Sequence, residues 1–106
     1  MPILTVFRSR LNVGVENLYN TLAEEASVLA RGVPGFLEEK TFAATDGERV
    51  TVVLFADHIS HQAWRDHPRH QEVQAIGRTK LYAEYCVYSA EVEYSRSFAA
   101  DARRLQ

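Results

Sequence analysis

The Asp46-Gly47 dipeptide is the sequence feature that most restricts how this chain can fold. It lies between two runs of β-forming residues, at 36–44 and 49–56. Asp-Gly is typical of the tight turns that join paired antiparallel strands, because glycine readily adopts the positive φ that such turns need. The sequence therefore predicts a β-hairpin in the middle of the chain.

Helical and β-forming patterns follow each other in a regular order on both sides of the hairpin. The further expected elements are a strand at 3–10, a helix at 15–30, a short helix ending near 67, a helix at 68–81 and a strand at 82–94. This order is typical of the ferredoxin-like βαββαβ fold of the α+β class, in which an antiparallel sheet carries its helices on one face. We expect one such domain at 1–95 and a polar C-terminal tail at 96–106, from which Phe98 and Leu105 could contact a partner.

The short helix after the hairpin has its own start and stop signals. Ser60 is expected to be its N-cap, and Ile59 and Trp64 have the spacing of a hydrophobic staple around that cap. Pro68 disfavours helical geometry in the residue before it, so this helix is expected to end near His67. Pro68 can also occupy the first position of the following helix.

Composition excludes several classes of protein. The chain has 106 residues, 46% of them hydrophobic, which is enough for one folded core. Its formal net charge of −2 gives no electrostatic case for binding nucleic acid or an anionic membrane. No apolar run is long enough to span a membrane and the N-terminus does not resemble a signal peptide, so a cytoplasmic location is expected. The single cysteine, Cys86, cannot form an internal disulfide and is expected to be a packed thiol.

The strand expected at 49–56 is apolar on both of its faces. Helices on one side of the sheet can cover only one of these faces. On the last strand Cys86 and Tyr88 alternate with Tyr85, and Tyr82 is expected on the same face as Tyr88. Because an uncovered apolar face usually marks a contact with a partner, we expect a homodimer in which two sheets face each other by isologous pairing.

All four histidines lie within thirteen residues that also contain the only tryptophan. His58 and His61 are three residues apart, and so are His67 and His70, which is a spacing compatible with a shared metal. However, Pro68 interrupts the helix between the second pair. No second cysteine or carboxylate motif completes a zinc ligand set, so no metal site is expected.

The first two histidines are expected to be solvated, whereas His67 and His70 are compatible with either a surface or a small-molecule pocket. His70 is spaced to share the inward stripe of its helix. Gln74 and Arg78 follow it at intervals of four residues, which predicts a polar line along one helix face. A solvated stripe is the alternative interpretation of that line.

Taken together, several of these segments resemble the antibiotic biosynthesis monooxygenase superfamily, a group of dimeric α/β-barrel proteins. The resemblance covers about 3–93, nearly the whole domain. It is carried by Val33-Pro34-Gly35-Phe36, the hairpin Asp46-Gly47-Glu48, the strand end at Phe55, and the segments 64–70, 77–78 and 82–85. The resemblance implies the fold more strongly than the chemistry, since one fold can host several reactions.

Two branches of that superfamily can be compared residue by residue. In the branch that oxidises aromatic quinols and anthrones with O₂ and no cofactor, the implied helix tryptophan matches Trp64, and His70 stands where some members have a tyrosine. In the haem-degrading branch an iron-ligating histidine stands ten residues after the tryptophan, where this chain has Gln74. That branch also has an asparagine on the first strand, where this chain offers Arg8 and Ser9.

The resemblance and the residue types imply a monooxygenase, an oxidoreductase that acts on a planar quinol- or phenol-like small molecule with O₂ and no cofactor. Such chemistry needs a base, a dry cavity and donors for a developing oxyanion. The expected catalytic residues are His70, His67, Trp64 and Arg78, and the expected substrate contacts are Trp64, Gln74, Tyr82 and Phe55. The alternatives are a non-catalytic carrier or sensor of the same fold, and a haem or metal binder.

Overall fold

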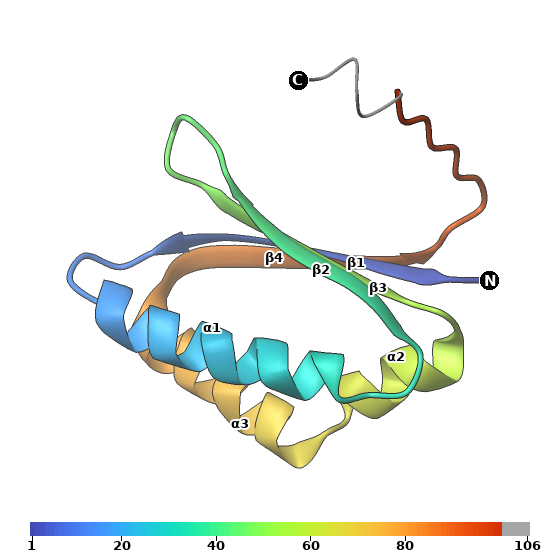
Figure 1. Ribbon diagram of the computed structural model, residues 1–106. Coiled ribbons are helices and arrows are strands. Elements are labelled where there is room, and N and C mark those ends of the chain that lie inside the picture. The colour runs from blue at the N-terminus through green and yellow to red at the C-terminus, as the bar shows by residue number, and fades with distance from the viewer. Residues whose placement is uncertain (101–106) are drawn as a thin grey trace.

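Four antiparallel strands in the order β2-β3-β1-β4 form one curved sheet, and every helix lies against the same face of it (Figure 1). The computed structural model describes residues 1–100. The elements are β1 (Ile3–Leu11), α1 (Glu16–Arg31), β2 (Phe36–Ala43), β3 (Arg49–Phe55), α2 (His58–Arg65), α3 (Pro68–Ile76), a π-helical turn η1 (Gly77–Leu81) and β4 (Tyr82–Glu91). The predicted ferredoxin-like α+β fold is confirmed, including the hairpin between β2 and β3.

The last strand was expected at 82–94, and β4 ends earlier, at Glu91. Phe98 is exposed, and Leu105 lies outside the described residues. Within residues 1–100, no helix combines the length and the apolar character needed to cross a membrane.

The start of α2 corrects the sequence interpretation. The N-cap is Asp57, whose carboxylate accepts a 2.8 Å hydrogen bond from the backbone N–H of Ser60. The helix therefore begins three residues earlier than a Ser60 cap implies. The expected staple is absent, because Ile59 is 80% exposed. Asp57 is a strong N-cap residue that the apolar spacing around Trp64 obscured.

Helix α3 begins where the sequence predicts and ends earlier than expected. Pro68 occupies the first position of α3, and the side chain of His67 caps it. The α-helical hydrogen bonding stops at Ile76, and the chain continues as the π-helical turn η1 before entering β4. Gly77 is buried at this junction, where an added Cβ would lie 2.7 Å from the ring of Tyr82. The close approach of that ring explains why the smallest residue stands there.

The faces of β4 also differ from the prediction. A register shift between Arg10 and Leu11 disturbs the alternation where β1 meets the start of β4. As a result Tyr82 and Tyr85 lie together, with ring centroids 5.7 Å apart, instead of on opposite faces. Tyr88 stays on the outer face, opposite Val6. The irregularity lies in the pairing of two strands, so alternation within one strand cannot reveal it.

The core lies where the inner face of the sheet meets α1 and α2. It is a cluster of buried residues with half-buried ones packed against it: Ala30, Val53, Phe55, Val33, Phe36 and Trp64. The outer face of the sheet carries no helix, and Cys86 on that face is exposed. The expectation of a packed thiol is therefore wrong for the single chain.

The turn between α1 and β2 depends on a glycine, and we predict that Gly35→Ala is destabilising. Gly35 has a φ of 95°, and an added Cβ would lie 2.0 Å from the Ser60 hydroxyl oxygen. Strain and overlap together should lower the free energy of unfolding by about 1–3 kcal/mol, measured by urea denaturation. The matched control is Gly32→Ala, because Gly32 has a φ of −81° and its nearest neighbours are 3.6 Å away. Equal stability of the two variants would contradict the prediction.

Candidate functional site

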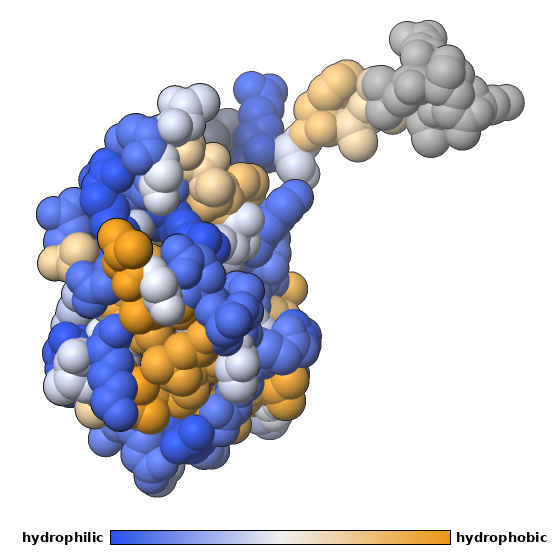
Figure 2. Space-filling model, turned by 90° about the vertical axis from the view of Figure 1, so that its left-hand side faces the viewer, coloured by the Kyte–Doolittle hydropathy of each residue, from blue (hydrophilic) through white to orange (hydrophobic). Residues whose placement is uncertain are grey.

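A cavity of about 250 Å³ lies between the inner face of the sheet and the layer formed by α1, α3 and η1. Its apolar walls include Phe7, Leu22, Val53, Val73, Leu81 and Val87. Figure 2 looks at one end of the molecule and shows hydrophobic side chains visible between hydrophilic ones. A concave, mostly apolar space with a few polar groups is typical of a small-molecule site.

Trp64 forms part of the cavity wall and packs between the core and a histidine. Its ring centroid lies 5.3 Å from that of Phe55 and 4.4 Å from that of His70. The indole Nε1 is buried and has no hydrogen-bond partner among the described residues. Phe55 itself is fully buried in the core and does not line the cavity. The structure thus places Trp64 at the cavity and Phe55 behind it.

His70 lines the cavity and is 7% exposed. Burial, helped by the nearby His67, lowers the pKa of His70 to about 4. The imidazole is therefore uncharged at neutral pH. Its Nδ1 atom is buried without a hydrogen-bond partner in residues 1–100. An uncharged imidazole can accept or donate one hydrogen bond at each nitrogen, according to its tautomer.

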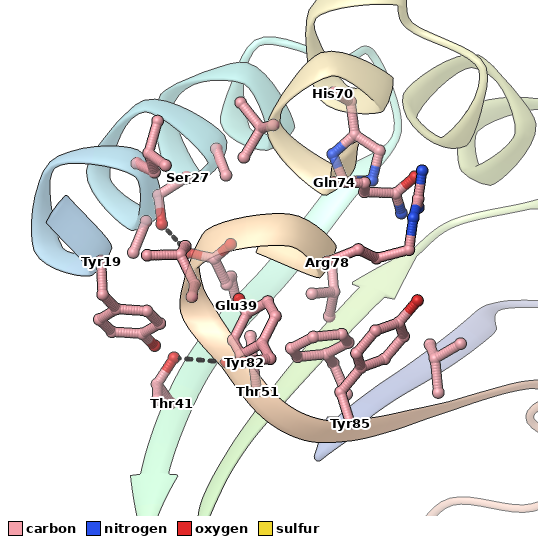
Figure 3. Close-up of a pocket in the computed structure, with 18 of the residues that line it drawn as sticks. Tyr19, Ser27, Glu39, Thr41, Thr51, His70, Gln74, Arg78, Tyr82 and Tyr85 are labelled. Carbon is pink, nitrogen blue, oxygen red and sulfur yellow. Dashed lines mark hydrogen bonds between the residues drawn. The ribbon is translucent and has the colours of Figure 1, made fainter. Parts of the chain in front are cut away.

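Gln74 and Arg78 continue from His70 along the same side of the helical segment. All three line the cavity and lie close together at one side of it (Figure 3). Gln74 and Arg78 are exposed, which places them at the rim, whereas His70 is buried. The polar line expected from four-residue spacing is present, and it borders the cavity. The junction of α3 and η1 keeps Arg78 on this side despite the change in helix type.

A cluster of three aromatic rings lines the sheet side of the cavity. The Phe7 ring lies 5.3 Å from that of Tyr82 and 5.5 Å from that of Tyr85. Burial, reinforced by Tyr19 and Tyr85, raises the pKa of Tyr82 to about 12. Tyr82 therefore keeps its proton at neutral pH and can donate a hydrogen bond.

Several polar residues of the cavity were missed by the sequence interpretation, among them Glu39, Ser27 and Tyr19. Glu39 on β2 is half-buried, and its carboxylate accepts a hydrogen bond from the hydroxyl of Ser27 on α1. Tyr19 on α1 lies near them (Figure 3). Glu39 stands in a run of three charged residues, and a register shift between Phe36 and Glu38 disturbs their alternation. Only the pairing of Glu39 with the buried Val53 shows that it faces inward.

The other three histidines of the cluster do not line the cavity. His67 is exposed, and its Nδ1 accepts a 3.1 Å hydrogen bond from the backbone N–H of Arg69. His61 was expected to be solvated, but it is 4% exposed and forms a 3.0 Å hydrogen bond with the Thr5 hydroxyl. Because α2 begins at His58, His61 falls on its inner face. His58 is exposed, as expected.

The histidines do not converge with other ligand-type side chains. Among residues 1–100, no group of three or more histidine, cysteine, aspartate and glutamate side chains is arranged to hold a metal ion. The ring centroids of His61 and His70 lie 6.0 and 4.4 Å from that of Trp64.

Comparison with known proteins relates the chain to one sequence relative and to a group of solved structures. No family model matches the sequence. YqjZ of Bacillus subtilis, an uncharacterized protein, is 33% identical over 99 residues, which cover 92% of this chain and 85% of YqjZ. The chain belongs to the family of YqjZ.

The structural matches extend the relationship to the fold. Rv0793 of Mycobacterium tuberculosis matches with a TM-score of 0.80 and 16% identity, over 92% of this chain and all of Rv0793. A variant of SnoaB, a cofactor-independent oxygenase of Streptomyces nogalater, matches with a TM-score of 0.76 and 12% identity, over 89% of this chain and 95% of SnoaB. An antibiotic biosynthesis monooxygenase matches with a TM-score of 0.72 and 11% identity, over 85% and 97% of the two chains. The predicted resemblance is confirmed: this chain has the fold of the antibiotic biosynthesis monooxygenase superfamily.

The lowered pKa of His70 predicts that the fold loses stability in mild acid. Between about pH 6.5 and pH 4 the unfolded chain binds a proton at this imidazole while the folded chain does not. The free energy of unfolding should therefore fall by up to about 3 kcal/mol as the pH drops through this range. In His70→Asn this part of the pH dependence disappears. Burial lowers the pKa of His61 too, which leaves a smaller slope of the same sign.

Urea midpoints measured from pH 4 to pH 7 test this prediction. The matched control is His67→Asn, because His67 is exposed. Its slope should stay close to that of the unchanged protein, because burial is the larger cause of the lowered His70 pKa and His67 the smaller. If His70→Asn kept the same pH dependence of stability as the unchanged protein, the predicted contribution of His70 would be wrong.

Proposed function

We propose that this protein is a monooxygenase that oxidises a planar quinol- or phenol-like small molecule with O₂ and no cofactor. The observation that supports this most directly is the cavity in which His70, Arg78 and Tyr82 border an apolar space with Trp64 as a wall. SnoaB, which is described as a cofactor-independent oxygenase, shares the fold. Small volume and aromatic walls favour a flat ligand.

The oxidation balances without an external reductant. A naphthol ring, for example, loses its O–H proton and transfers one electron to O₂, and the two radicals combine into a hydroperoxide at a ring carbon. Loss of water from that hydroperoxide leaves a second carbonyl, so naphthol and O₂ give naphthoquinone and water. The protein then has to favour the phenolate and exclude bulk water.

In this proposal His70 and Arg78 share the work on the phenolic oxygen. A free imidazole with a pKa of about 4 is a weak base towards a phenol, whose ordinary pKa is about 10. A phenolate formed next to His70 would raise the imidazole pKa, because opposite charges stabilise each other at short range. The Arg78 guanidinium keeps its charge and stabilises the same oxyanion. The buried Tyr82 hydroxyl is a further donor.

Turnover by matched histidine variants tests the assignment. His70→Asn should reduce O₂ consumption on a panel of naphthols and quinols by at least about a hundredfold, the usual contribution of a positioned acid or base. His67→Asn should keep near-normal turnover, because His67 caps a helix outside the cavity. An oxygen electrode measures the turnover of each variant, and one O₂ should be consumed for each product molecule formed. Equal losses in both variants would contradict a specific role for His70.

The same assay separates the catalyst from a carrier or sensor of the same fold. A protein that binds members of the panel in calorimetry but consumes no O₂ above the uncatalysed rate would overturn the catalytic proposal. Binding alone would then be the function that the cavity supports.

We further propose that the protein is a homodimer joined through the outer face of the sheet. Phe42 and Tyr88 lie on this face, paired with Val50 and Val6, and each is at least half exposed. Leu4 and Val52 on its central strands are only partly covered by their neighbours. A two-fold arrangement would bury this face against its own copy.

A charge on the outer face tests the dimer. Tyr88→Lys should shift the mass measured by sedimentation equilibrium from dimer towards monomer, because it would bury a charge without a partner in an apolar interface. The matched control is Val28→Lys, which places the same charge at an exposed apolar position on α1. A monomeric unchanged protein, or an unaffected Tyr88→Lys, would contradict this interface.

A further inference from the structure

The carboxylate of Glu39 is an unusual group to find in a largely apolar cavity. It is half-buried and lines the space, and its only hydrogen-bond partner among residues 1–100 is the Ser27 hydroxyl. No lysine, arginine or histidine of these residues forms an ion pair with it. Partly desolvated carboxylates are normally paired, since a lone charge loses hydration.

Arg78 is the complementary case at another part of the same cavity. Within the described part of the chain its guanidinium forms no ion pair, unlike Arg8, Arg10 and Arg69. Figure 3 shows Arg78 next to Gln74 and His70, whereas Glu39 lies on the side of Ser27 and Tyr19. The cavity therefore carries an anionic side chain on one side and a cationic side chain on another, and apolar residues make up much of the remaining lining.

We propose that Glu39 and Arg78 select a flat aromatic ligand that carries an anionic or carbonyl oxygen at one end and a hydroxyl at the other. The oxygen acceptor is held by Arg78, and the hydroxyl donates to the Glu39 carboxylate. This inference rests on the cavity of the proposed function as the ligand site and not on its reaction with O₂.

The chemistry of the two charged groups explains the selectivity. A carboxylate only accepts hydrogen bonds, so a second anionic group at the Glu39 end would meet a like charge. A ligand without a hydroxyl would leave the half-buried carboxylate with less hydration and no new partner. The volume of about 250 Å³ is below the range typical of drug-sized ligands, which favours one or two fused rings.

Three naphthalene probes of similar shape test the proposal under anaerobic conditions, where no turnover occurs. The probes are 6-hydroxy-2-naphthoate, 2-naphthoate and naphthalene-2,6-dicarboxylate. Calorimetry should give the tightest binding for the hydroxynaphthoate, at least about fivefold weaker binding for naphthoate and at least about tenfold weaker binding for the dicarboxylate. The indole N–H resonance of Trp64, the only tryptophan, should shift with each bound probe and locate it in the cavity.

Variants of the two charged residues separate their roles. Glu39→Gln keeps an oxygen that can accept from Ser27 and removes the charge. Binding of the dicarboxylate should therefore strengthen, so that it is only about twofold weaker, or less, than binding of the hydroxynaphthoate. Arg78→Gln should weaken the binding of all three probes at least about fivefold, because each of them carries a carboxylate. The matched control is Glu38→Gln, because Glu38 is exposed and pairs with Leu54, which places it on the outer face of the sheet, away from the cavity. It should change none of these affinities.

The outcomes separate this inference from the proposed function. Equal affinities for the three probes, each with a shifted Trp64 signal, would overturn the selection by Glu39 while the cavity remains a ligand site. An unchanged dicarboxylate affinity in Glu39→Gln would overturn it too. If no probe binds and yet naphthols are turned over with O₂, the charge-based selection fails and the oxygenase proposal stands.

Discussion

The packing of Phe55 against Trp64 determines where the two layers of this protein touch and where they separate. Phe55 is fully buried, and it joins the inner face of the sheet to α1 through Ala30 and to α2 through Trp64. Away from this cluster, the facing residues of α1 include the small Ala23 and Ala26, which cannot fill the space under a curved sheet. The cavity is thus a consequence of where the large core residues stand, and Trp64 belongs to both regions.

Desolvation shifts the pKa values of the buried groups in the site, and the direction of each shift depends on the charge of the ionised form. Burial disfavours charged forms, so it lowers the pKa of His70 and raises that of Tyr82. Both groups are therefore uncharged at neutral pH. The charges that remain at the cavity belong to Arg78 at the rim and to the half-buried Glu39. A ligand thus meets a largely apolar space that is lined by one cationic and one anionic side chain.

The parts of the fold and the site that follow from local rules could be predicted from the sequence. The Asp46-Gly47 turn and the start of α3 at Pro68 depend on neighbouring residues only, and so does the line of His70 and Arg78 along one helix face. One local signal, the Asp57 cap of α2, was also missed. The site features that were missed depend on pairing between distant segments. Glu39 faces inward because of its register with β3, and Tyr82 joins Tyr85 because of a shift between β1 and β4. Alternation within one strand carries no information about such shifts.

His67 and His70 show how one residue type acquires different properties three positions apart. His67 precedes Pro68, is held in an extended conformation, and uses Nδ1 to cap the helix that the proline opens. His70 lies within that helix and is carried by it against Trp64, where burial makes its pKa drop. Pro68 is therefore the residue that divides the cluster, because it keeps His67 extended and opens the helix that carries His70. A sequence count of histidines treats the two as equivalent, whereas the backbone leaves only His70 with a ring available to a molecule in the cavity.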